Sequence, residues 1–162
     1  MTPIILLDNL EEFIREKTKD IKLQVRTRSE STEDKVREAE IYKMRLPNKD
    51  AQTQRVPYIL IQLLGGEDDK EDREPEESTC QIRIVVAAYA EDAGAGSMDV
   101  LNLILRIRSE LKKVGILGKT FCLQLPLEYI IYPDSPQPYY FGEMITNWSL
   151  PVVKREVESI WQ

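Results

Sequence analysis

Two long apolar runs separated by a short acidic stretch constrain the fold of this chain most strongly. The runs are VPYILIQLL (residues 56–64) and STCQIRIVVAAYA (residues 78–90), and their β-branched side chains favour strands over helices. Between them, GGEDDKEDREPEES (residues 65–78) opens with two glycines, which readily adopt the backbone angles of a sharp exit from a strand. The pattern predicts a long hairpin whose crossing is a mobile loop over about residues 65–78.

Three further segments alternate between two faces, which is the pattern of half-buried strands. They are IYKMRLP (residues 41–47), FCLQLPLEYIIY (residues 121–132) and YYFGEMITNWSLP (residues 139–151). In the second segment, every odd-numbered residue from Phe121 to Ile131 is apolar. In the third segment, one face carries Tyr140, Met144, Trp148 and Leu150.

An amphipathic helix is expected near the N-terminus. Thr2 and Pro3 suit a helix start, and apolar residues then recur at helical spacing, so the helix should end near Thr18. IKLQVR (residues 21–26) is compatible with a short strand or with an extension of this helix. Residues 27–40 hold one clearly apolar side chain and are expected to form a mobile loop.

A second, better-defined helix is expected to begin at Ser97, a good N-cap residue, and to end before Gly115. Its apolar face consists of Val100, Leu103, Ile104, Ile107, Leu111 and Val114. Leu101 and Leu105 lie beside this stripe and widen it. Both leucines are therefore candidates for contact with another subunit.

The predicted order of elements is helix, three strands, helix and two strands. An apolar sheet face must be covered, so this order predicts an α+β fold with a mostly antiparallel sheet of about four to five strands and both helices packed on one face. A chain of 162 residues is long enough for one core and too short for two full ones. Residues 1–162 are therefore expected to form a single domain.

Composition narrows the class of protein. Hydrophobic residues make up 42% of the chain and charged residues 31%, and no apolar run approaches the roughly 20 residues that span a bilayer. The N-terminus lacks a basic start and soon turns acidic, so it does not resemble a secretory signal. We expect a cytosolic protein without a membrane partner.

Cys80 and Cys122 are too few for a disulfide scaffold, and each is expected to be a reduced, buried thiol.

The net charge of -6 belongs to one stretch of the chain. Eight of the 28 acidic residues and two of the 22 basic residues lie between Glu67 and Glu77, so 20 of each remain elsewhere. A run of like charge is usually solvated.

Basic residues concentrate only at Arg15, Lys17, Lys19, Lys22, Arg26 and Arg28. Acids are interleaved there and aromatic residues are absent between them, so no specific nucleic-acid binding is expected.

The sequence offers little for enzymatic chemistry. It contains no histidine, which removes Ser-His and Cys-His nucleophiles and most zinc ligand sets. Gly65 and Gly66 lack the spacing of a phosphate-binding loop. The acidic stretch lacks the calcium-loop pattern and is interrupted by Lys70, Arg73 and Pro75. We therefore expect no catalytic residue, no cofactor and no metal ligand.

Three consecutive aromatic residues, Tyr139, Tyr140 and Phe141, follow three closely spaced prolines. Consecutive strand residues point to opposite faces, so these rings cannot all face one core. At least one of them is expected to be exposed or to contact a partner. Together with Leu101 and Leu105, they are the candidate residues of a subunit interface.

Three phrases of the sequence resemble a known group of proteins. RVPYILIQLLGGEDD (residues 55–69), IRIVVAAYAEDAGAGSMDVLNLILRIRSEL (residues 82–111) and LQLPLEYIIYPDSPQPYYFGEMITNWSLP (residues 123–151) look like minor structural proteins of tailed bacteriophages and prophages of Gram-positive hosts. The resembled group comprises tail terminator, tail completion and neck proteins. The resemblance covers about residues 55–151 and consists of strand, loop and helix phrases. It assigns no role to the acidic stretch.

The resemblance implies a small α+β subunit that closes into a ring, commonly of six, at the head-proximal end of the tail tube. There the ring would stop tube growth and present a surface to the head connector. The implied partners are further copies of the chain, the tail tube protein and the head connector or neck proteins. The implied location is the virion, after synthesis in the bacterial cytoplasm. No catalytic residues carry over.

Two other classes of function remain open. One is a small α+β module that binds a ligand or nucleic acid, and the other is a metal-dependent enzyme. Self-association into a closed ring favours the structural role, whereas a discrete monomer with a ligand-sized apolar pocket favours the binding module. Saturable binding of a divalent cation would favour the enzyme.

Overall fold

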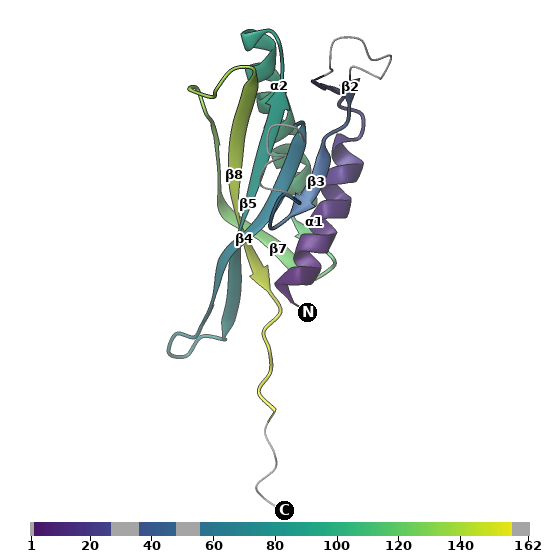
Figure 1. Cartoon of the computed structure of the whole chain (residues 1–162). Helices are drawn as coiled ribbons and strands as arrows, with labels where there is room; N and C mark the ends of the chain where they lie inside the picture. The colour runs from purple at the N-terminus through teal and green to yellow at the C-terminus, as the bar shows by residue number, and fades with distance from the viewer. Residues whose placement is uncertain (1, 27–35, 48–55, 157–162) are drawn as a thin grey trace, which may run out of the picture.

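The structure, a computed structural model, describes residues 2–26, 36–47 and 56–156. Figure 1 shows the helices packed against a curled sheet, with a hairpin that projects beyond them. In chain order the elements are α1 (Pro3–Thr18), β1 (Leu23–Gln24), β2 (Val36–Arg37), β3 (Glu40–Lys43), β4 (Tyr58–Asp69), β5 (Glu77–Tyr89), α2 (Ala93–Val114), β6 (Ile116–Leu117), β7 (Phe121–Ile131) and β8 (Tyr139–Leu150).

The main sheet has six strands in the order β3-β4-β5-β8-β7-β6. β3 runs parallel to β4, and the other neighbouring pairs in this described sheet are antiparallel. The α+β class is confirmed. The prediction of a mostly antiparallel sheet of four to five strands is wrong, because the sheet is mixed and has six strands. Alternation reveals a strand but not its direction, and β6 has only two residues, too few to show any period.

Both helices pack on one face of this sheet, as predicted. Leu6, Leu10 and Ile14 of α1 are fully buried at the i, i+4 spacing that lines one side of a helix. They share a core with residues of α2 and the sheet, including Leu103, Ile104, Ile107, Ile82, Ile84, Met144 and Trp148. Each fully buried side chain of this size stabilises the fold by about 1.5–3 kcal/mol. Neither described helix combines the length and apolar character needed to cross a bilayer.

The opposite face of the sheet has no helix over it in the described part of the chain. A smaller apolar cluster lies there, formed by Val56, Tyr58, Leu60, Ala87 and Tyr139. These residues alternate in β4, β5 and β8 with those that face the helices. We call this side of the sheet the helix-free face.

β4 and β5 continue into the acidic stretch. They stay paired as far as Asp69 and Glu77, so residues 65–69 and 77–78 belong to strands and not to the predicted loop, and residues 70–76 form the turn between the strands. Strand pairing uses the backbone, and acidic side chains on a two-stranded ribbon can reach water on both faces. Residues 64–77 are exposed, and Figure 1 shows this hairpin projecting beyond α1. We call residues 64–77 the acidic arm.

Other predicted boundaries are corrected by the structure. Of the loop expected over residues 27–40, residues 27–35 lie outside the described residues, while β2 and the start of β3 occupy part of the remainder. Residues 21–26 contain the short strand β1 and do not extend the helix. β3 ends at Lys43, well before the predicted end at Pro47.

The start of α2 also differs from the prediction. The helix begins at Ala93 and not at Ser97, because the side chain of Asp92 accepts a hydrogen bond from the backbone nitrogen of Ala95 at 3.2 Å. Asp92 therefore caps the helix five residues before Ser97, the N-cap expected from the sequence. The small residues of the first turn, which resemble a loop in the sequence, are helical here.

β7 does not keep the strict alternation that the sequence suggests. Its register with β8 shifts between Gln124 and Glu128, around Pro126, which has no N–H to donate to a neighbouring strand. As a result Leu125 is 73% exposed, although its position in the alternation predicted burial. Phe121 is fully buried in the core, and Leu123, Leu127 and Ile131 pack against it while partly exposed.

Candidate interaction surface

The three consecutive aromatic residues alternate along β8, as predicted. Tyr140 faces the helices and packs over Gly96, whereas Tyr139 and Phe141 lie on the helix-free face. The Tyr139 hydroxyl accepts a hydrogen bond from Arg26 at 2.7 Å. Tyr139 is 9% exposed and Tyr140 is 7% exposed, so both side chains are used within the subunit. Phe141 is half-buried and keeps some surface for a partner.

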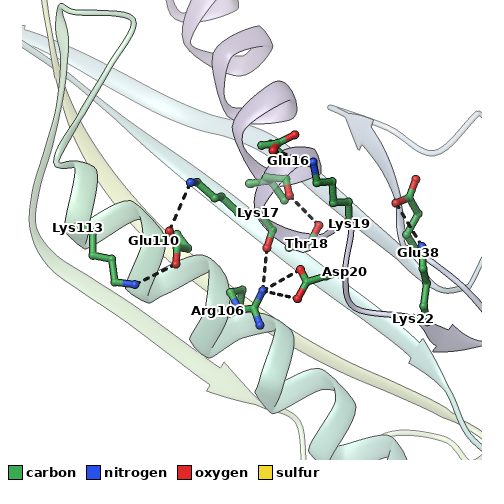
Figure 2. Close-up of polar contacts among 11 residues, drawn as sticks. Glu16, Lys17, Thr18, Lys19, Asp20, Lys22, Glu38, Arg106, Glu110 and Lys113 are labelled. Carbon is green, nitrogen blue, oxygen red and sulfur yellow. Dashed lines mark hydrogen bonds and ion pairs between the residues drawn. The ribbon is translucent and has the colours of Figure 1, made fainter.

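The flank of α2 that faces α1 is held by a group of ion pairs (Figure 2). Arg106 donates from Nη1 to both carboxylate oxygens of Asp20, at 2.9 and 3.0 Å, and to the carbonyl of Lys17 at 3.2 Å. Glu110 pairs with Lys17 at 3.7 Å and with Lys113 at 3.1 Å. The hydrogen bond from Arg106 lowers the pKa of Asp20, and the one from Lys113 lowers the pKa of Glu110. The charged side chains Arg106 and Glu110 on this flank therefore have their partners within the subunit.

The opposite flank of α2 has no such partners. Leu101, Leu105, Arg108 and Lys112 follow one another at three- and four-residue steps, which places them on one side of the helix. Both leucines are half-buried and Lys112 is exposed. The Arg108 guanidinium lies 5.8 Å from the ring centre of Tyr129 in β7. Among the described residues, neither Arg108 nor Lys112 has an acidic partner. We call these four residues and Tyr129 the edge surface.

The backbone of β7 is open beside the edge surface. β6 pairs only with Phe121 and Cys122, and within the described ranges nothing pairs with the outer side of β7 from Gln124 to Ile131. Leu125 and Tyr129 of this strand are exposed. An exposed strand edge with apolar side chains is a template for association with another chain.

Two open hollows lie along the helix-free face, and sequence analysis did not identify them. One, of about 440 Å³, is bordered by residues such as Arg83, Val85, Tyr132 and Phe141. Arg83 donates from Nε to the carboxylate of Glu143 at 2.5 Å, and a hydrogen bond with Glu143 raises the pKa of Tyr132. The other hollow, of about 500 Å³, lies beside β7 and β8. In the sequence, the position of the charged Arg83 inside the apolar segment QIRIVV (residues 81–86) was the signal that could have indicated this site.

The basic residues near the end of α1 are matched with nearby groups. The ion pairs are Arg15–Glu11 (2.8 Å), Lys17–Glu110 (3.7 Å), Lys19–Glu16 (2.8 Å) and Lys22–Glu38 (3.9 Å). Arg26 is bonded to Tyr139, and Arg28 lies outside the described residues. Arg15, Lys17, Lys19 and Lys22 are therefore paired with carboxylates, whereas the partner of Arg26 is a neutral hydroxyl.

Carboxylates and thiols do not gather into a metal site in the described ranges. No three Cys, Asp or Glu side chains there are placed to hold a metal ion together. Both cysteines are free thiols. Burial raises the pKa of Cys80 to about 11, which keeps this thiol protonated and unreactive at neutral pH. Cys122 is only half-buried, so the prediction of a buried thiol is confirmed for Cys80 and not for Cys122.

Comparison with known protein families finds none that matches this chain, and no curated protein matches it significantly. A functional assignment therefore depends on the surfaces described above and on the resemblance of residues 55–151.

Proposed function

We propose that this chain is a non-enzymatic assembly protein of a tailed bacteriophage or prophage. Several copies, commonly six in the resembled group, close into a ring at the head-proximal end of the tail tube. The ring stops tube growth and joins the tail to the head connector and neck proteins. The protein is made in the bacterial cytoplasm and becomes part of the virion.

The observation that carries this proposal is the edge surface beside the open backbone of β7. Natural proteins normally protect strand edges, because an open edge pairs with other chains. Here the edge is accompanied by an aromatic ring and an arginine, which are residue types enriched in the cores of protein interfaces, and by two half-buried leucines that add apolar area. A subunit with this surface gains stability when another protein chain covers it.

A second candidate function is a small module that binds a ligand. The hollow of about 440 Å³ on the helix-free face favours it, because its volume is in the range of ligand sites and it combines Phe141 and Val85 with the charged Arg83. Arg83 is already engaged by Glu143, which weakens its capacity to bind an anion. A monomeric protein whose ligand binding is lost in Arg83→Ala would support this alternative over the ring.

Electron microscopy of phage that lack this gene tests the proposed function. The expected lysate contains tails of uncontrolled length or tails without heads, and no infectious particles. Wild-type protein supplied from a plasmid should restore normal particles. Leu105→Glu should fold but fail to restore them, whereas Ile5→Glu, on the exposed side of α1, should restore them. Normal infectious particles in the deletion lysate would rule the proposed function out.

A further inference from the structure

The tip of the acidic arm, residues 69–77, is a freestanding part of the subunit. β3 pairs with β4 only from Tyr58 to Ile61, and β8 pairs with β5 only as far as Ser78. Ser78 lies opposite Asp68, so only Asp69–Glu77 extend beyond β8, while Gly65–Asp68 form the outer strand of a three-stranded part of the sheet. All side chains of the arm are exposed. Two-stranded hairpins are marginally stable on their own in water. A surface that covers the arm would therefore stabilise its structure.

The arm carries the net charge of the whole chain. Eight acids and two bases lie between Glu67 and Glu77, and the remaining residues hold equal numbers of each sign. In the described part of the chain, no carboxylate of the arm pairs with a basic side chain. The arm is thus a negatively charged element whose counter-charges lie elsewhere.

The edge surface has the complementary character. Arg108 and Lys112 are positively charged and have no acidic partner among the described residues, although Arg106 and Lys113 on the other flank of the same helix do. Leu101 and Leu105 add apolar area beside these charges. The open outer backbone of β7 lies at the same edge of the sheet.

We propose that the acidic arm of one copy covers the edge surface of the next copy in the assembly. β4, which leads into the arm, and β7 are separated in the sheet by β5 and β8, and the arm projects away from the body (Figure 1). The arm and the edge surface of one subunit therefore lie apart, while those of neighbouring subunits can meet. Contact between two different patches generates a ring when the rotation closes. This inference rests on the proposed ring and names the surfaces that close it.

Substitutions that reverse the charges of the edge surface, of the acidic arm, or of both together test this inference. Sedimentation of the full chain measures the concentration at which the assembly dissociates. Arg108→Glu with Lys112→Glu should raise that concentration by about tenfold or more, and so should the arm variant with Glu67→Lys, Asp68→Lys and Asp69→Lys. A chain that carries all five substitutions should return to within about threefold of the wild type, because the charges again attract.

Lys113→Glu is the matched control, because Lys113 lies at the same end of α2 but on the other flank, where it pairs with Glu110. It should leave the dissociation concentration unchanged, and circular dichroism should show that every variant is folded. The inference is overturned if the arm variant assembles like the wild type, or if the combined variant assembles no better than either parent. In those cases dissociation by Leu105→Glu would still support the ring itself. A wild-type chain that never associates would remove both proposals.

Discussion

At the scale of single residues, the core depends on one buried polar arrangement as well as on apolar contacts. Thr146 is fully buried, and its hydroxyl donates to the carbonyl of Ile82 at 3.0 Å. The same oxygen accepts a hydrogen bond from the indole nitrogen of Trp148 at 2.8 Å. A buried indole N–H needs an acceptor, so Thr146 fixes the position of the largest side chain in the core.

Thr146→Val should therefore destabilise the protein although the two side chains have nearly the same shape. The substitution leaves the Trp148 indole N–H without an acceptor, which should lower the free energy of unfolding by about 1–3 kcal/mol. Urea denaturation followed by Trp fluorescence measures the change. Thr79→Val is the control: Thr79 is half-buried, but its hydroxyl only reaches the exposed carbonyl of Glu67, at 3.5 Å, so the variant should stay within about 0.5 kcal/mol of the wild type.

Gly96 provides a second test at this scale, because it lies against the ring of Tyr140. A Cβ atom at Gly96 would stand 2.1 Å from the Cδ2 atom of Tyr140. Gly96→Ala should lower the free energy of unfolding by about 1–3 kcal/mol through overpacking, even though alanine is the better helix former. Gly94→Ala, in the same turn and in ordinary contact only, should be neutral or stabilising. Thermal denaturation of the two variants would contradict this packing if both gained stability.

What the sequence could predict about residues follows from periodicity. The prediction of which side chains of β8 face the core was correct, because a period of two can be recognised within a single segment. The contact of Gly96 with Tyr140 and the pair Arg83–Glu143 join different elements, so they depend on packing and strand register. Neither packing nor register can be determined from either segment alone.

At the scale of elements, the two helices are joined by charge as well as by their apolar faces. Arg106 of α2 bonds to the carboxylate of Asp20 just after α1, and Glu110 bonds to Lys17 (Figure 2). The pKa of Asp20 is held below its ordinary value of 3.8 by the hydrogen bond from Arg106. A carboxyl group with a lowered pKa stabilises the folded state above its unfolded pKa, and the contribution is lost as the pH falls through the folded pKa.

Asp20→Asn should therefore lower the melting temperature at pH 6, and its difference from the wild type should shrink as the pH falls below about 4. Once the Asp20 carboxyl group is protonated it is neutral, like the amide of the variant, so the ion pair with Arg106 no longer distinguishes the two proteins. Thermal melts between pH 6 and pH 3 measure this difference. Asp134→Asn is the control, because no described base pairs with Asp134. A difference that stays constant with pH would contradict the electrostatic origin.

The acidic arm should be dispensable for folding of the subunit. Replacement of residues 67–77 by a short Gly/Ser linker should change the free energy of unfolding by less than about 2 kcal/mol, because the removed side chains are exposed and hairpin loops tolerate changes of length. Urea denaturation of the variant, at a concentration where the chain is monomeric, measures the change. A larger loss of stability would show that the arm packs on its own subunit.

The elements predicted from the sequence were those with strong internal periods. α1 was located with its bounds, and the β4–β5 hairpin was found, because their apolar patterns are long. The arm was mistaken for a loop because its charged side chains hide a backbone ladder. The start of α2 was placed late because Asp92 and the small residues after it have the composition of a turn.

At the scale of the whole molecule, the sheet has two unlike edges. One side leads into the acidic arm, and the other side carries the edge surface with its open backbone. In the proposed assembly each subunit places one of these unlike surfaces against the other surface of its neighbour, and such head-to-tail contacts generate a ring when the rotation between neighbours closes. From the sequence, Leu101 and Leu105 were predicted as interface candidates because they lie beside the apolar stripe of α2 that faces the core. Arg108, Lys112 and Tyr129 were not predicted, because only the fold brings α2 beside the edge of β7.

The central claim is that copies of this chain associate through the edge surface into one closed assembly, and native mass spectrometry with light scattering tests it most directly. For the wild-type chain of 18.8 kDa, we expect a single species whose mass is a fixed multiple of the monomer and does not grow with concentration. Leu105→Glu, folded by circular dichroism, should remain at the monomer mass. A wild-type protein that stays at 18.8 kDa at every concentration would contradict the account, and so would a Leu105→Glu variant that assembles like the wild type.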